Sequence, residues 1–131
     1  MKITTIKSFK AIVNIGLEYG YSQKPIQKNE ILESISEYQK KLMLEEEFYL
    51  SCSVIDSLIV LNNQREKHLK LEFINYPKFP TKENTLKNYI EKLTVFLMKK
   101  FHQNRVVIEY LNETKMIEFS NDVDERINKK T

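Results

Sequence analysis

Six polar side chains, scattered along the chain, are of the types that bind anions or transfer protons. Two arginines can each hold a carboxylate or phosphate through paired hydrogen bonds. Two histidines titrate near neutral pH and can act as acid or base. A tyrosine and a glutamine add hydrogen-bonding groups. The predicted ligand-binding set is Tyr21, Arg65, His68, His102, Gln103 and Arg105, with Tyr19 and Gln64 beside it.

The elements that must position these side chains centre on two extended runs. Tyr49–Leu61 is the most apolar stretch of the chain, and His68–Tyr76 alternates apolar and charged residues around Leu69-Lys70-Leu71-Glu72-Phe73. Alternation of this kind is typical of a half-buried strand. The polar connection between the runs, residues 62–67, then makes the pair a predicted β-hairpin at the centre of the domain.

Two stretches have the apolar spacing of helices. In residues 27–47, Ile31 and Ile35 begin a stripe at intervals of three and four that continues to Leu42, and Asn29 is the expected N-cap. In Lys82–His102 a similar stripe runs from Leu86 to Phe101, and Thr81 is the expected cap.

Three more segments are predicted strands. Residues 11–19 alternate, so that Ala11, Val13 and Ile15 would share one face. Arg105–Leu111 alternates too, and Lys115–Phe119 has the pattern of a short extra strand, with a stop between the last helix and strand at Asn104.

The order strand, helix, strand, strand, helix, strand predicts an α+β fold, the ferredoxin-like βαββαβ sandwich. Right-handed crossovers would place two helices on one face of a four-stranded antiparallel sheet in the order 4-1-3-2, with an optional short fifth strand. This topology gathers the six polar side chains at one end of the sheet. We expect a single domain over residues 1–120 and a polar C-terminal tail over 121–131, with a turn or two of helix.

The second face of such a sheet has no helix to cover it. Apolar residues are nevertheless expected there, namely Ile12, Ile55, Ile59, Ile74 and Val107. An uncovered apolar face is commonly a partner surface, which predicts a homo-oligomer, most simply a dimer, joined through a sheet face or edge. The alternative is that the N-terminal arm or the last strand covers this face.

Composition excludes several classes of site. Two glycines are too few for a phosphate-binding loop or a dinucleotide fingerprint, and two histidines with one cysteine provide no zinc-type spacing, so neither cofactor nor metal is predicted. The 21 basic and 18 acidic residues are interleaved and give a net charge of only +3, which argues against nucleic-acid binding. No segment is apolar enough for a membrane span, and the expected location is the cytoplasm.

Two residues within the apolar run need an explanation. The lone Cys52 has no neighbouring histidine or lysine to activate it, so it is expected to be a small core residue. Asp56 interrupts the apolar run; we expect it at a bulge or on the wet side of an edge strand, whereas a catalytic acid of raised pKa is the less favoured alternative.

Two short motifs carry a family resemblance. Gln64-Arg65 in the hairpin and Phe101-His102-Gln103-Asn104-Arg105-Val106 after the last helix resemble small bacterial tautomerase-like domains of unknown function, over about residues 11–110. That resemblance implies the fold but no established activity, and tautomerases with an N-terminal proline differ from this chain, which begins Met1-Lys2. Two functions stay open: an oligomeric interaction domain that binds a small anion, and a small tautomerase or isomerase that uses His68 or His102.

Overall fold

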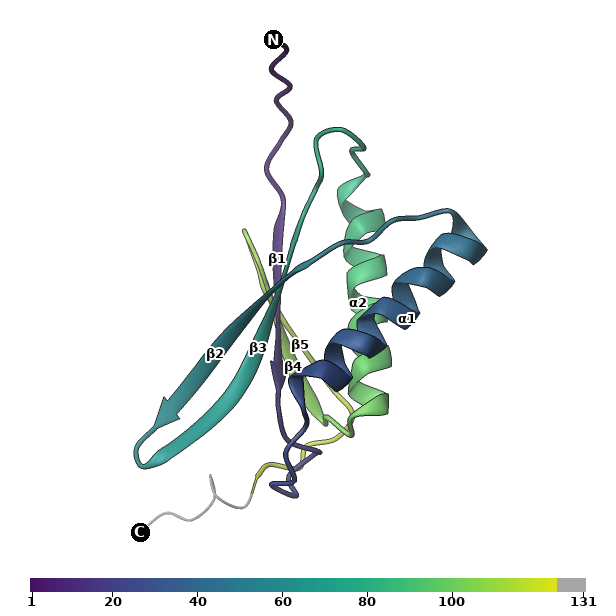
Figure 1. Ribbon diagram of the computed structural model, residues 1–131. Helices are drawn as coiled ribbons and strands as arrows, with labels where there is room; N and C mark the ends of the chain where they lie inside the picture. Colours follow the sequence, from purple (N-terminus) through teal and green to yellow (C-terminus); the bar gives the residue numbers. More distant parts are fainter. Residues whose placement is uncertain (125–131) are drawn as a thin grey trace.

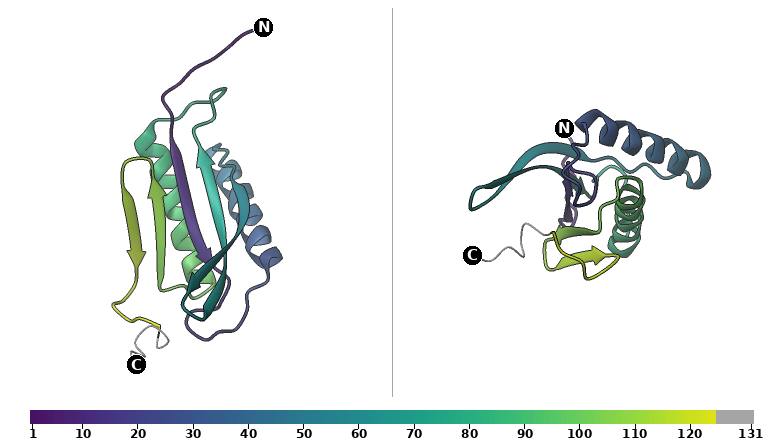
Figure 2. Two further views of the ribbon diagram at one scale, coloured as in Figure 1. Left: turned by 90° about the vertical axis from the view of Figure 1, so that its left-hand side faces the viewer. Right: turned by 90° about the horizontal axis from the view of Figure 1, so that it is seen from below.

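A computed structural model describes residues 1–124, which form one antiparallel sheet and two helices (Figure 1). The elements are β1 (Lys10–Gly16), α1 (Lys28–Glu46), β2 (Ser53–Leu61), β3 (Gln64–Ile74), α2 (Glu83–Lys100), β4 (Arg105–Tyr110) and β5 (Thr114–Glu118). The sheet order is β2-β3-β1-β4-β5, and both helices lie on one face (Figure 2). The predicted α+β class is confirmed. The optional short strand expected over Lys115–Phe119 forms as β5, so that β5 and not β4 is one edge of the sheet.

The core lies between the sheet and the helices. On β1 the side chains of Ala11, Val13 and Ile15 are buried, and they alternate with half-exposed residues as the sequence pattern predicts. Leu71 of β3 is buried on the same face, opposite Val13 in the ladder. Leu93, on the buried stripe of α2, also belongs to this core. Because the apolar stripes of both helices and alternate strand residues share one core, the opposite face of the sheet is left open.

The β2–β3 hairpin is longer and its turn tighter than predicted. Leu61 pairs with Gln64 across a turn of only Asn62 and Asn63, so β3 begins at Gln64 rather than His68. Asn62 has φ 54, a left-handed conformation that asparagine tolerates better than most residues. The polar residues after the turn are polar because the end of this ribbon projects away from the helices (Figure 1), and not because they form a loop.

Both predicted helix caps are wrong. Helix α1 starts at Lys28, where the Glu30 carboxylate accepts a 2.8 Å hydrogen bond from the Gln27 N–H. Asn29 lies inside the helix and donates to Glu33 instead (3.1 Å). The N-cap position of α2 is Lys82, whose side chain makes no capping hydrogen bond. The Asn75 side chain bonds both the N–H and the carbonyl of the preceding Thr81.

The ends of β1 and α2 also come earlier than predicted. Strand β1 stops at Gly16, and the chain then turns through residues 17–26, where Glu18 forms an isolated bridge to Pro25. Helix α2 ends at Lys100, and His102 takes a left-handed φ of 55, which ends the helix before the expected stop at Asn104.

The open face is polar at its centre, contrary to the apolar surface expected there. Lys70 donates a 2.8 Å hydrogen bond to the side chain of Asn14, and Asn14 donates in turn to Glu109 (3.1 Å). Ile12 and Val107 lie between these groups and are half-buried, whereas Ile55, Ile59 and Ile74 are exposed. The polar side chains in the middle of this face therefore pair with one another across the strands. Exposed apolar side chains are concentrated toward β2.

Asp56 lies on edge strand β2 in regular register with Leu69, without a bulge. Its side chain is exposed and forms an ion pair with Lys28 at 3.1 Å. Of the two placements expected, an exposed position on an edge strand is confirmed and a bulge is not. Within residues 1–124, neither helix is long and apolar enough to cross a membrane. The sequence predicts a turn or two of helix in the C-terminal tail, and residues 125–131 of that tail lie outside the described part of the chain.

Candidate functional site

Tyr21 and Arg105 meet at one end of the sheet, as predicted. The Arg105 guanidinium donates to the Tyr21 hydroxyl (3.5 Å) and to the Asp122 carbonyl (3.1 Å). Its Nε also forms a 2.7 Å ion pair with Glu118 of β5. The hydrogen bond that Arg105 donates to Glu118 is the main reason that the pKa of Arg105 is raised. Because Glu118 already neutralises Arg105, an anionic ligand would have to displace it.

His68 lies over the backbone of β1. It pairs with Gly16, and a Cβ on that glycine would lie 3.6 Å from the His68 ring and 3.3 Å from the Gln103 carboxamide. The missing side chain therefore lets both groups lie close to the strand. His68 Nε2 is 3.4 Å from the Glu66 carboxylate, whereas its buried Nδ1 has no hydrogen-bond partner within residues 1–124. Such an atom is a candidate contact for a bound molecule.

Gln103 and His102 have different surroundings. Gln103 is buried and donates from its side chain to the Glu18 carbonyl, which fixes the carboxamide against the loop after β1. His102 is exposed and packs against that loop, with its ring 6.4 Å from the ring of Tyr19. Its carbonyl would lie only 3.0 Å from a Cβ on Gly20. Both residues thus anchor the loop, and the structure gives the two histidines different neighbours.

Arg65 lies apart from the other five predicted site residues. It pairs with Val60 on the projecting part of the β2–β3 ribbon, past the end of β1. Because successive strand residues point to opposite faces, its side chain leaves the sheet on the other side from His68 and Glu66. The six predicted residues therefore separate into a Tyr21–Arg105 corner, a His68–Gln103 contact over Gly16, His102 on the loop, and Arg65.

A cavity of about 730 Å³ lies at the opposite end of the sheet, and sequence reasoning missed it. We call it the aromatic cavity. Its volume lies within the range typical of small-molecule sites. The lining residues come from the segment before β2 and the segment between β3 and α2: Glu47, Phe48, Tyr49, Leu50, Ser51, Ile74, Tyr76, Phe79, Pro80, Thr81 and Leu86. The signal in the sequence is the concentration of aromatic residues at the two ends of the hairpin.

The walls of the aromatic cavity are held in place from outside it. Phe48 stacks on Tyr89 of α2, with ring centroids 4.0 Å apart and planes 15° apart. On the other wall, the Asn75 side chain bonds the backbone of Thr81 with one 2.8 Å and one 2.9 Å hydrogen bond. Leu50, between the two walls, is buried. The cavity is therefore formed before any ligand binds, which lowers the cost of binding.

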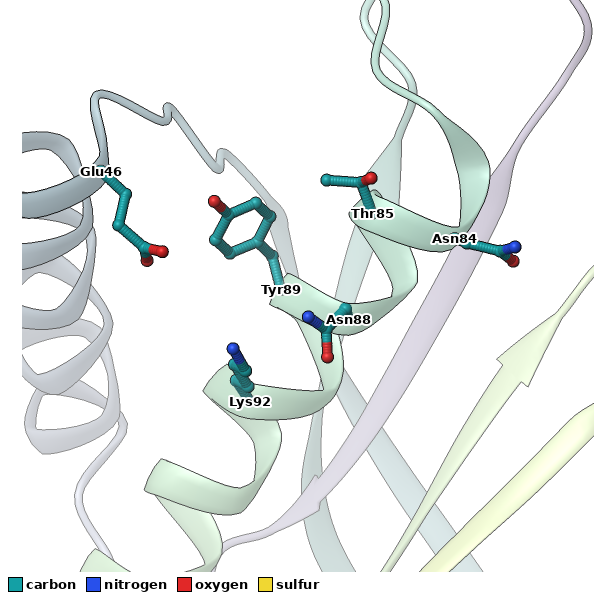
Figure 3. A pocket seen from close by; sticks show the side chains of 6 residues that line it. All are labelled: Glu46, Asn84, Thr85, Asn88, Tyr89 and Lys92. Atoms are coloured by element: carbon teal, nitrogen blue, oxygen red, sulfur yellow. The ribbon is translucent and has the colours of Figure 1, made fainter.

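Two smaller hollows are polar. The first, of about 330 Å³, lies between the helices, where Glu46 of α1 points toward Tyr89 and Lys92 of α2 while Asn84 points away (Figure 3). The second, of about 350 Å³, includes the Lys100–Glu37 ion pair (3.3 Å). Glu46 and Lys92 offset one another in the first hollow. The second is lined by Glu30, Glu33 and Glu37 with Lys100 as its one basic residue, so its charge is net negative.

Comparison with known proteins gives two matches, both to solved structures. A phage SAM lyase in complex with S-methyl-5'-thioadenosine is 16% identical, with a TM-score of 0.61 over 94% of this chain and 98% of the other. A phage SAM lyase in the apo state is also 16% identical, with a TM-score of 0.59 over 88% and 92%. No family model and no curated protein matches. The likeness establishes the fold alone.

Proposed function

We propose that this chain is a ferredoxin-like domain that binds S-adenosylmethionine (SAM) and cleaves it to S-methyl-5'-thioadenosine. The observation that carries the proposal is the match to a phage SAM lyase with this thioether nucleoside bound, which spans 94% of this chain and 98% of the other. A match over nearly the full length of both chains leaves no separate domain to which the ligand site of the neighbour could belong. Fold alone does not define an activity, so the site must be tested directly.

The chemistry sets two requirements for such a site. SAM carries a positive sulfonium and a planar adenine, and release of the thioether nucleoside breaks the bond between sulfur and the amino-acid chain, with both electrons retained by sulfur. The carbon released from sulfur then either forms a double bond as a neighbouring proton is lost or bonds to an oxygen of the substrate's own carboxylate, so no further reactant is needed. A SAM site must therefore hold an aromatic base and tolerate a cation. The aromatic cavity, of about 730 Å³ and with Glu47 as its charged lining residue, supports the proposal on both points.

Incubation of the purified protein with SAM tests the activity. We expect S-methyl-5'-thioadenosine to form in proportion to protein concentration, measured by chromatography against SAM kept without protein, because SAM also decomposes slowly by itself. Calorimetric titration with S-methyl-5'-thioadenosine tests binding separately. Binding without turnover would reduce the proposal to a ligand-binding domain, whereas neither binding nor turnover would overturn it.

The two finer predictions from the sequence have unequal support. A homo-oligomer remains part of the proposal, because β2 is an edge strand with several exposed apolar side chains. A small anion as ligand has weaker support, because the guanidinium of Arg105 is already bound to Glu118 and to two backbone carbonyls. We therefore favour a cationic ligand over an anionic one.

A tautomerase or isomerase that uses His68 is the alternative function. The observation that favours it is the pairing of His68 with Glu66 at 3.4 Å, together with the unpartnered Nδ1 on the same ring. A base of this kind would exchange the protons next to a carbonyl group. If no α-keto acid exchanges these protons in D₂O faster with the protein than with a His68→Gln variant, this alternative is excluded.

A further inference from the structure

We infer that the aromatic cavity recognises a soft organic cation, a sulfonium or an alkylated ammonium, through aromatic ring faces and the Glu47 carboxylate. Its application to SAM rests on the function proposed above. The class of ligand follows from the cavity itself, and its test uses cations that carry no adenosyl group.

Three aromatic rings at the cavity are exposed although their segments are fixed. Tyr49, Tyr76 and Phe79 are 81%, 57% and 73% exposed. The rings of Tyr76 and Phe79 lie 6.3 Å apart with planes only 20° apart, and the Phe79 N–H donates to the Tyr76 carbonyl in the turn that presents them. The faces of aromatic rings are negative and attract cations.

The end of α1 beside the cavity carries concentrated negative charge, whereas Lys78 and Lys82 in the segment between β3 and α2 do not line the cavity. Helix α1 ends in Glu45 and Glu46 with Glu47 as its cap, and its last turn contains no basic residue. The carbonyl end of a helix is itself negative, so this charge placement is unfavourable unless a cation is bound nearby. Glu47 takes a left-handed φ of 52 that ends the helix, and it lines the cavity. No described lysine or arginine forms an ion pair with Glu47.

The lining selects among cations. A metal ion needs several oxygen or nitrogen ligands at once, and no group of three histidine, cysteine or acidic side chains suited to a metal occurs within residues 1–124. Leu86 at the cavity is buried, and Ile74 adds another apolar wall. An alkylated cation matches this lining because its methyl groups cover apolar surface while its charge meets the ring faces and Glu47.

This arrangement has a consequence for a SAM-cleaving protein. The substrate carries the sulfonium charge, and the thioether product does not. A site that uses ring faces and a carboxylate binds the charged molecule more tightly than the neutral one, so the product would leave more readily than the substrate.

NMR titration with choline and with its neutral carbon isostere, in which carbon replaces nitrogen, tests the inference. The two molecules have the same shape, so the difference between them isolates charge. We expect signals of the Tyr76 and Phe79 rings to shift, with choline about threefold to tenfold tighter than the isostere. Trimethylsulfonium should behave as choline does. Equal affinity for choline and the isostere, or no binding of either, would overturn the inference.

Paired variants locate the effect. Phe79→Leu removes a ring face and Glu47→Gln removes the charge; each should weaken choline binding at least about threefold. The controls are Phe119→Leu, an exposed aromatic at the end of β5, and Glu45→Gln, which changes charge by the same amount without lining the cavity. If a variant and its control weaken choline binding equally, the inference is also wrong. Failure of SAM cleavage with intact choline binding would remove the activity alone.

Discussion

Cys52 shows how far the chemistry of a single side chain follows from its setting. It lies just before β2 and packs partly against the core. Burial raises the pKa of its thiol to about 11, so the reactive thiolate is scarce at neutral pH. The sequence predicts a small, unactivated core residue because no histidine or lysine is its neighbour; Cys52 instead lies at the margin of the core, where it is partly buried.

This burial predicts a pH dependence of stability. In the unfolded chain the thiol ionises near 9.0, whereas in the folded chain it stays protonated up to about 11. Above pH 9 the unfolded state therefore binds fewer protons, and the contribution of Cys52 to the free energy of unfolding falls as pH rises, then levels off near 11. Urea titrations of the protein and of a Cys52→Ala variant across this range should diverge accordingly. Parallel curves would contradict the burial, as would thiol labelling at pH 8 as fast in the folded as in the unfolded protein.

Helices and strands were predicted best where burial on one face gives the apolar residues a regular spacing. They were predicted least well where contacts between residues distant in sequence determine the structure. The apolar alternation of Ala11, Val13 and Ile15 was enough to place β1. Nothing local showed that Asn75 would bond the backbone of Thr81, or that Glu118 would neutralise Arg105 from β5. The contact between Tyr21 and Arg105 was predictable from the topology. The pairing of Arg105 with Glu118, which opposes binding of an anion, was not.

The contact between α2 and the β4–β5 edge depends on one buried tyrosine. The Tyr110 hydroxyl donates a 2.7 Å hydrogen bond to Glu91 of α2. Burial is the main reason that the pKa of this phenol is strongly raised, and the hydrogen bond to Glu91 is the second. Lys115 of β5 also approaches Glu91, at 3.1 Å. Lys87 lies over the Tyr110 ring, 4.6 Å from its centre. The Glu91 carboxylate thus joins α2 to β4 through Tyr110 and to β5 through Lys115.

Removal of that hydroxyl should weaken the joint without leaving a hole. Tyr110→Phe keeps the ring and loses a hydrogen bond to a charged group, for which we expect a loss of about 1–2 kcal/mol in the free energy of unfolding, measured by urea titration. Lys115 continues to pair with Glu91, so the larger penalty for a stranded carboxylate does not apply. Tyr49→Phe, at a largely exposed tyrosine, is the control. An unchanged midpoint for Tyr110→Phe would show that the bond contributes nothing.

At the scale of the whole molecule, the unexplained feature is the projecting β2–β3 ribbon. Its outer strand is a free sheet edge, and Leu58, Val60 and Leu61 on it are each more than half exposed. Because neighbouring strand residues face opposite ways, both sides of the ribbon expose apolar surface. Free edges normally carry charge or proline that prevents association. An edge this apolar is the strongest support for the predicted homo-oligomer.

The association should depend on these side chains more than the monomer fold does. A Leu58→Lys, Val60→Lys double variant should behave as a monomer by sizing chromatography with light scattering, whereas the unmodified protein is expected to elute as an oligomer at tens of micromolar. Leu111→Lys, an exposed leucine after β4, is the control and should leave the oligomer intact. If the unmodified protein has the mass of a monomer by light scattering, the oligomer is no longer part of the proposal. An oligomer that survives the double variant would instead place the interface on another surface, with the polar centre of the open face around Lys70 and Asn14 as the next region to mutate.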